Sequence, residues 1–212
     1  MKRSIPKMWV LLVVSWLPVQ YCRAGIIIVD VERYNSFNNP PSIAGPLVNG
    51  SLSYVDRVHR YADVPAVLVG AEYVKVANDD KFPASYRLDV TLSQAATLCL
   101  FLDHRLGNGV TYGMPGENMN PNLEAAGMNW VEDQGFIDTR WDIGIDEYSD
   151  GSINQYFSVF AKDVEAGTIT LLQQCDTTTA DDRNMYGVAA IPEPTTLALL
   201  GLGTLVMVRH RK

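Results

Sequence analysis

Apolar and polar positions divide the chain into a body flanked by two uncharged apolar runs. The runs cover 8–19 and 197–208, and the body between them alternates short apolar segments with Gly, Asn, Asp and Ser. Within 86–92 apolar side chains occupy every second position, which is the period of a half-buried β-strand. Strand signals recur along the body, at 26–31, 52–62, 66–77, 86–92, 97–103, 142–148, 153–161, 168–173 and 185–190.

The fold class predicted from this pattern is all-β. No segment of the body keeps an apolar stripe at helical spacing over more than about eight residues. Residues 98–102 are continuously apolar and therefore predict a central strand covered on both faces. The sequence Ser-Asp-Gly-Ser at 149–152 lies between two strand signals and predicts a hairpin turn. We expect 25–191 to form a single antiparallel β-sandwich, jelly-roll-like, outside the cytoplasm.

The N-terminus is typical of an export signal. Basic residues precede the apolar run 8–19, and Ala24 is then followed by Gly25. A charged start, an apolar middle and a small residue at the cut define a signal peptide, so we expect signal peptidase to remove 1–24. An uncleaved membrane anchor is the alternative, but the run is shorter than the roughly 20 residues that span a bilayer.

The C-terminal segment 192–212 has three parts in a fixed order. Pro192, Glu193 and Pro194 hold the backbone extended, as the cleft of a processing enzyme requires. The apolar stretch 195–208 would form a helix of roughly 21 Å, which enters a hydrocarbon core of roughly 30 Å but anchors weakly. A basic stop follows, formed by Arg209, Arg211 and Lys212. By the positive-inside rule this cluster stays in the cytoplasm and leaves the body outside.

This order of motif, apolar helix and basic stop resembles the PEP-CTERM sorting signal of Gram-negative bacteria that make exopolysaccharide. The resemblance rests on Pro192, Glu193 and Pro194 and covers only 192–212. It implies that an exosortase in the cytoplasmic membrane recognises the tail, removes it near the motif and passes the body to the cell surface or matrix. Contact with the membrane would then be transient. A protein that keeps a single span is the alternative.

The charge of the body excludes two classes of partner. The chain has 24 acidic and 17 basic residues, but seven of the basic residues lie in the two terminal signals and only one acid, Glu193, does. The body 25–191 therefore carries 23 acids and 10 bases, a net charge of −13. Such a surface repels nucleic acid and anionic lipid.

The body offers few catalytic motifs. His59 and His104 are its histidines, and no Gly-x-Ser-x-Gly, Cys-x-x-Cys or zinc-spaced histidine pair occurs. Asp103 and Arg105 flank His104 at a predicted strand end, which favours a salt-bridged terminus over a site. A glycosidase needs two carboxyl groups about 5–9 Å apart, but any acidic surface offers such pairs. We expect no enzymatic activity, and a polysaccharide-active hydrolase or lyase is the least favoured alternative.

Aromatic side chains supply a candidate ligand site. The irregular segment 107–138 is long for a connection inside a compact domain, and such segments tend to be functional. It contains Tyr112 and Trp130, and Trp141 follows shortly after it. These three side chains are candidate platforms for stacking on sugar rings. For each one alone, a place in the core is the competing interpretation.

One loop is a candidate calcium site. Asp146, Asp150 and Asn154 place oxygen atoms at positions one, five and nine of an EF-hand-like register, but Tyr148 and Phe157 occupy two ligand positions. An EF-hand is therefore rejected, and a looser structural Ca²⁺ site remains a hypothesis, here or at 78–80. An ordinary Asp-Gly turn explains the same residues. No cofactor is expected to be required.

Two cysteines remain if the signal peptide is removed. An exported protein meets an oxidising compartment, so Cys99 and Cys175 could form a disulfide bond. Cys99 lies within the apolar run 98–102, where a free cysteine also packs well as a small apolar side chain. Both interpretations stay open at this point.

The favoured function is an exported surface or matrix protein whose sandwich binds exopolysaccharide without catalysis. A purely structural matrix protein, which binds other matrix components or nothing tightly, is the main alternative. In that case substitution of the aromatic residues would reduce stability rather than binding.

Overall fold

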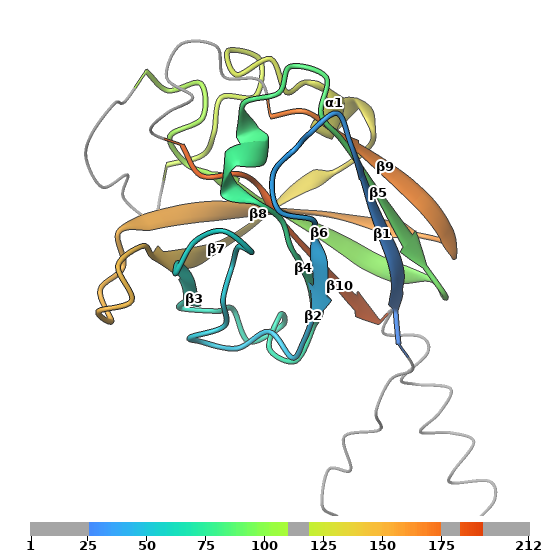
Figure 1. Cartoon of the computed structure of the whole chain (residues 1–212), viewed down its shortest axis with the longest axis horizontal. Coiled ribbons are helices and arrows are strands. Elements are labelled where there is room, and N and C mark those ends of the chain that lie inside the picture. The colour runs from blue at the N-terminus through green and yellow to red at the C-terminus, as the bar shows by residue number, and fades with distance from the viewer. Residues whose placement is uncertain (1–25, 110–118, 175–182, 193–212) are drawn as a thin grey trace, which may run out of the picture.

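The computed structural model describes residues 26–109, 119–174 and 183–192, and these form two antiparallel β-sheets (Figure 1). The smaller sheet has the order β1-β5-β9, formed by Ile28–Tyr34, Arg87–Leu92 and Gly167–Leu172. The predicted all-β class is confirmed, because the helical elements here are only η1 (Asn78–Lys81) and α1 (Trp130–Asp133).

The larger sheet has seven strands in the order β2-β4-β10-β6-β8-β7-β3. Their bounds in that order are Ser42–Ala44, Glu72–Lys75, Gly187–Pro192, Ala96–Asp103, Gln155–Val164, Ile137–Asp146 and Arg60–Ala62. The sheet curls into a half-barrel, so that its two short edge strands, β2 and β3, lie on the same side of the molecule (Figure 1).

The main core lies between the two sheets. Strand β5 alternates as the sequence predicts, with Leu88, Val90 and Leu92 buried and the intervening residues half-buried. These side chains pack in one cluster with Leu98 and Leu100 of β6. Burial of such a continuous apolar layer is the main stabilising contribution to a sandwich of this size.

A second core covers part of the outer face of the seven-stranded sheet. Cys99 and Phe101 of β6 and Val159 of β8 point into it. Leu47 from the β2–β3 connection and Leu68 from the β3–β4 connection pack in the same cluster. Strand β6 is therefore central and covered on both faces, which confirms the prediction from its continuous apolar run. This cover is incomplete, and the remaining open part of the outer face holds the groove described below.

Each of the nine segments with a strand signal contains an observed strand. The signal at 52–62 is too long, because only the three residues of β3 enter the sheet and Ser53 bonds back to His59 within the loop. Strand β2 is missing from the prediction, since Pro40, Pro41 and Pro46 around it favour irregular backbone. Strands β7 and β8 form the predicted hairpin across 149–152.

The terminal signals lie outside the described residues. These are the predicted signal peptide 1–24 with Gly25, and the tail from Glu193 to Lys212 with its expected helix at 195–208. In the part of the chain that the structure describes, no helix is long and apolar enough to cross a membrane. Pro192, the first residue of the predicted sorting motif, is the last residue of β10.

Candidate functional site

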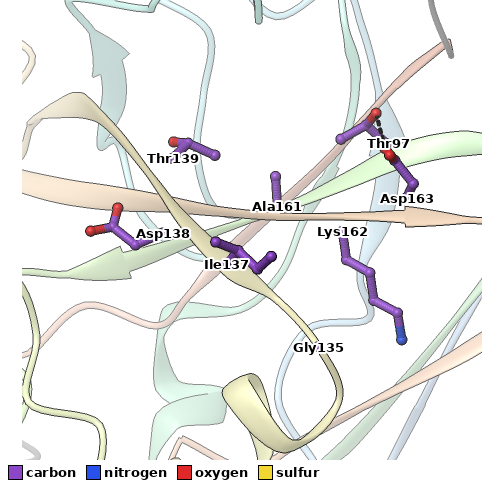
Figure 2. Close-up of a pocket in the computed structure, with 8 residues that line it drawn as sticks. All are labelled: Thr97, Gly135, Ile137, Asp138, Thr139, Ala161, Lys162 and Asp163. Atoms are coloured by element: carbon purple, nitrogen blue, oxygen red, sulfur yellow. Dashed lines mark hydrogen bonds between the residues drawn. The ribbon is translucent and has the colours of Figure 1, made fainter.

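An open groove of about 520 Å³ is lined by the start of β7, the end of β8 and the start of β6 (Figure 2). Because residues of three strands line it, its shape depends on how β6, β7 and β8 pair. Its lining residues are Thr97, Gly135, Ile137, Asp138, Thr139, Ala161, Lys162 and Asp163.

A β-bulge in β7 shapes one wall of the groove. Asp138 pairs with Phe160, and the next paired residue of β7 is Trp141, so two residues are inserted between them. The inserted Arg140 has a φ of 62°, and its backbone N–H donates to Asp138 Oδ1 at 2.8 Å. Bulges of this kind re-aim side chains and are common next to binding sites.

The side chain of Thr139 holds the bulge closed. Its hydroxyl donates to the carbonyl oxygen of Val159 at 2.7 Å and accepts from the backbone N–H of Trp141 at 3.1 Å. The backbone that leads into Trp141 is therefore fixed before any ligand arrives. A preorganised wall of this kind lowers the entropy cost of binding.

Trp141 lies beside the groove on the outer face of the sheet. It pairs with Val159, while Ile137 pairs with Ala161, and these two residues of β8 point to the same face because they are two positions apart. The side chain of Trp141 is 39% exposed and that of Ile137 is 72% exposed. The pair presents an apolar strip to solvent along a part of β7 that pairs with β8 alone, because β3 pairs only with 144–146.

Polar groups border this apolar strip. Thr97 donates to Asp163 Oδ1 at 2.7 Å, and both side chains point to one side of β8 while Lys162 points to the other (Figure 2). Asp138 Oδ2 accepts from Asn120 Nδ2 at 2.9 Å. The groove thus combines apolar surface with hydroxyl and carboxylate groups that can exchange hydrogen bonds with a hydroxyl-rich ligand.

The other predicted stacking residues do not join Trp141. Trp130 is only 9% exposed, its indole N–H donates to the carbonyl oxygen of Gln173 at 3.0 Å, and its ring meets the edge of Tyr186. The stacking role predicted for Trp130 is therefore wrong, because the short helix α1 turns this ring into the main core. Tyr112 lies outside the described residues.

The strand end with Asp103 and Arg105 is a buried ion pair, as the sequence predicts. The guanidinium Nη2 donates to Asp103 Oδ2 at 2.6 Å, and Nε donates to Oδ1 at 2.9 Å. The same carboxylate accepts the backbone N–H of Asn184, whose amide donates to Glu147. Next to this network, His104 Nε2 lies 3.1 Å from Asp142 Oδ1. These groups join three segments rather than face a ligand.

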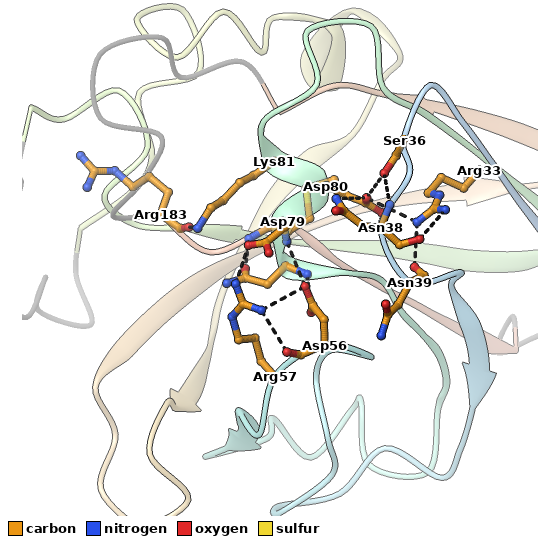
Figure 3. Close-up of polar contacts among 12 residues, drawn as sticks. Arg33, Ser36, Asn38, Asn39, Asp56, Arg57, Asp79, Asp80, Lys81 and Arg183 are labelled. Atoms are coloured by element: carbon orange, nitrogen blue, oxygen red, sulfur yellow. Dashed lines mark hydrogen bonds and ion pairs between the residues drawn. The ribbon is translucent and has the colours of Figure 1, made fainter.

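A second polar cluster surrounds η1 (Figure 3). Asp80 is fully buried, and its carboxylate lies 3.5 Å from Arg33 and accepts from Asn38. Asp79 is paired with Arg57. The acids of the alternative calcium segment 78–80 are therefore engaged by two arginines, which disfavour a cation at the same place.

The loop with the predicted calcium ligands is held by its own backbone. Asp146 is buried, and its carboxylate accepts the N–H groups of Tyr148, Asp150 and Gly151 at 2.8–3.2 Å. Hydrogen bonds from Ser152 lower the pKa of Asp150. The Oδ1 atom of Asn154 accepts the N–H of Glu147. Among the described residues no group of three His, Cys, Asp or Glu is arranged to hold a metal.

The proposed disulfide remains a prediction. Cys99 is buried in the second core, and burial raises the pKa of its thiol to about 12. Such a thiol packs as an apolar side chain and forms little thiolate at neutral pH. Cys175 lies outside the described residues.

Comparison with known proteins confirms the resemblance of the C-terminus. Residues 190–212 match the PEP-CTERM protein-sorting motif. The motif implies export, a membrane-anchored sorting signal and processing by an exosortase. No curated protein sequence matches the chain.

The fold is similar to parts of two solved enzymes. A β-glucuronidase from glycoside hydrolase family 2 aligns with 79% of this chain at 17% identity and a TM-score of 0.55. A GH138 enzyme that targets pectin rhamnogalacturonan II aligns with 78% of it at 13% identity and a TM-score of 0.46. This chain spans only 15% and 16% of those enzymes. The first similarity supports the β-rich fold and no more.

Sequence reasoning missed most of the groove. It found Trp141 but not Thr97, Ile137, Thr139 or Asp163, because these come from three strands whose register the sequence does not reveal. One local signal was present. The stretch 137–142 loses the alternation of its neighbours, which is how a bulge interrupts a strand pattern.

Proposed function

We propose that this chain is an exosortase-sorted surface or matrix protein whose β-sandwich binds exopolysaccharide without catalysis. The observation that carries the proposal is the exposed strip of Trp141 and Ile137 beside a preformed groove with hydroxyl and carboxylate borders. Sugar rings present apolar C–H faces to an aromatic ring and hydroxyl groups to polar neighbours.

The charge of the groove favours one class of polysaccharide as the ligand. The charged side chains that line the groove are Asp138, Asp163 and Lys162, and Nζ of Lys162 lies 5.9 Å from the ring centre of Phe136. The body as a whole is acidic. A neutral polysaccharide fits this surface better than a polyanionic one, because like charges would repel a uronic-acid or sulfated chain.

The hydrogen bonds of the two groove carboxylates also support a binding role. Asp138 accepts hydrogen bonds from Arg140 and Asn120, and Asp163 accepts one from Thr97. Carboxylates held in place by hydrogen bonds are positioned to orient a hydroxyl-rich ligand. The proposal is therefore a lectin-like surface rather than a hydrolase.

Retention on immobilised exopolysaccharide from the source organism tests the proposal. A soluble form with residues 25–192 keeps all of β10, and Trp141→Ala should lower its affinity about fivefold to tenfold through loss of ring stacking. Tyr148→Ala removes another exposed aromatic ring outside the groove and should leave retention unchanged. Equal retention of all three proteins, or no retention of the parent, would contradict the groove and favour a structural matrix role.

A further inference from the structure

The outer-face residues of the groove and its margin lie in three rows that cross β8. Each row is a pair of neighbours in the sheet that point to the same face, and the rows are Trp141 with Val159, Ile137 with Ala161, and Thr97 with Asp163. Successive rows are two residues apart along β8, so the first and the last row are separated by roughly 13 Å. The surface from Trp141 to Asp163 is therefore longer than a single sugar ring.

The two ends of this series differ in chemistry. Trp141 and Ile137 form the apolar strip at one end, whereas the row at the other end is polar. Asp163 is exposed, and its Oδ1 accepts the hydroxyl of Thr97 at 2.7 Å. This hydrogen bond fixes the orientation of the carboxylate. Because a carboxylate has about four lone-pair sites, most of its accepting capacity remains for a ligand.

Ala161 forms the floor between the two ends. Its side chain points to the same side of β8 as that of Asp163 (Figure 2). In the sheet Ala161 lies between its two paired neighbours, Ile137 of β7 and Cys99 of β6. A larger side chain at this middle position would stand between the apolar end and the polar end. The small residue therefore keeps the surface continuous from Trp141 to Asp163.

The polar end of the groove also lies at an open edge of β8. Strand β7 pairs with β8 only as far as Ala161, whereas β6 pairs with it as far as Val164. The chain that precedes β7 forms α1 and the turn at Gly135 instead. In the described part of the chain, 162–164 therefore have a strand partner on one side only. A ligand can reach Asp163 from the other side.

We infer that Asp163 determines the specificity of the groove by accepting hydrogen bonds from a second sugar, next to the sugar that stacks on Trp141. This role rests on the proposed function and adds what the groove selects, which is at least two linked neutral sugars aligned along β8, the second with free hydroxyl groups. Stacking tolerates any sugar with an apolar face, whereas a hydrogen bond is directional. A site built to bond a hydroxyl group discriminates against ligands that lack it.

Binding of fragments of increasing length tests the inference. The protein is the exported form purified from the source organism, and the probes are the single sugars and the linked fragments released from its exopolysaccharide by partial acid hydrolysis. We expect the affinity to rise about tenfold from a single sugar to a fragment that reaches Asp163, and then to level off. Equal affinity for single sugars and longer fragments would overturn the inference but leave binding at Trp141, and with it the proposed function, intact.

Asp163→Asn tests the carboxylate itself. The amide keeps the size of the side chain and an oxygen for Thr97, but it replaces one acceptor with a donor. We expect the affinity for longer fragments to fall about threefold to tenfold, and the affinity for single sugars to stay unchanged. The matched control is Asp89→Asn, because Asp89 accepts from Thr170 at 2.8 Å on the other sheet, and it should change neither affinity. Equal losses for both kinds of probe, or no loss for either, would overturn the inference.

Ala161→Leu tests the continuity of the groove. The leucine should interrupt the surface, so that longer fragments bind no better than single sugars. Ala161→Ser keeps the floor low and should bind like the parent, and affinities are expressed per folded molecule from the melting curves. Longer fragments that bind Ala161→Leu as well as the parent would overturn the inference alone. A parent protein that binds neither the fragments nor whole exopolysaccharide would overturn the inference and the proposed function together.

Discussion

The ion-pair network around Asp103 and Arg105 and the open groove both contain charged side chains. The network buries these side chains, whereas the groove exposes them to solvent. In this network Asp103, Arg105 and Asn184 are almost completely buried, and the carboxylate of Asp103 accepts hydrogen bonds from the other two. In the groove Asp163 and Ile137 are exposed. A dense group of charged residues therefore marks a structural joint here, and the functional candidate is a sparser, exposed surface.

The difference follows from the cost of burying charge. A buried carboxylate is tolerated only when partners satisfy its oxygens, so a group that has all its partners has little capacity left for a ligand. An exposed side chain keeps its bonding capacity, because water is easily displaced. The two tryptophans repeat the contrast, since Trp130 donates its N–H to the core and Trp141 remains at the surface.

Loss of the buried ion pair should have the largest effect on stability. Asp103→Ala leaves the guanidinium of Arg105 and the backbone N–H of Asn184 without their acceptor. We expect the free energy of unfolding to fall by about 3–5 kcal/mol in urea titrations followed by circular dichroism. The matched control is Asp79→Ala, because the pair of Asp79 and Arg57 is exposed and should contribute less than about 1 kcal/mol. Equal losses would show that burial does not separate the two pairs.

Replacement of the buried Trp130 should have the second largest effect on stability. Trp130→Ala opens a cavity beside Tyr186 and removes the hydrogen bond to Gln173, so we expect a loss of about 3–4 kcal/mol. Binding to exopolysaccharide, measured per folded molecule, should not change. Weaker binding by a variant that is still folded would return Trp130 to the ligand site and remove the contrast with Trp141.

Local sequence patterns predicted most of the fold. Alternation in β5 and the continuous apolar run in β6 each identified a strand and its environment, because burial is set by the period of the side chains. The groove could not be predicted in this way. Thr97 and Asp163 meet only because β6 and β8 pair in one register, and that register depends on the whole sheet. Trp130 was misassigned because a four-residue helix has too little periodicity to show which way it faces.

Loss of the hydrogen bonds that hold the bulge should lower both stability and ligand affinity. Thr139→Val keeps the shape of the side chain but removes its bonds to Val159 and Trp141. We expect a loss of about 1 kcal/mol in stability and an affinity about twofold to fourfold lower, because Trp141 is no longer held in place. Thr168→Val is the control, since Thr168 bonds to Thr91 at the edge of the other sheet. If both variants bind like the parent, the bulge does not organise the site.

Removal of calcium should have the smallest effect. The carboxylate of Asp146 already accepts three backbone N–H groups, and a cation at the same oxygens would displace bonds that shape the turn. We therefore expect the melting temperature to change by less than about 1 °C when a chelator is added, because a ligand that binds only the folded state must raise stability measurably. Asp146→Ala should destabilise the protein equally with and without calcium, since the turn bonds are lost in both cases. A fall in melting temperature on chelation that calcium reverses, and that Asp146→Ala abolishes, would instead place a metal ion in this loop and make it a second functional region beside the groove.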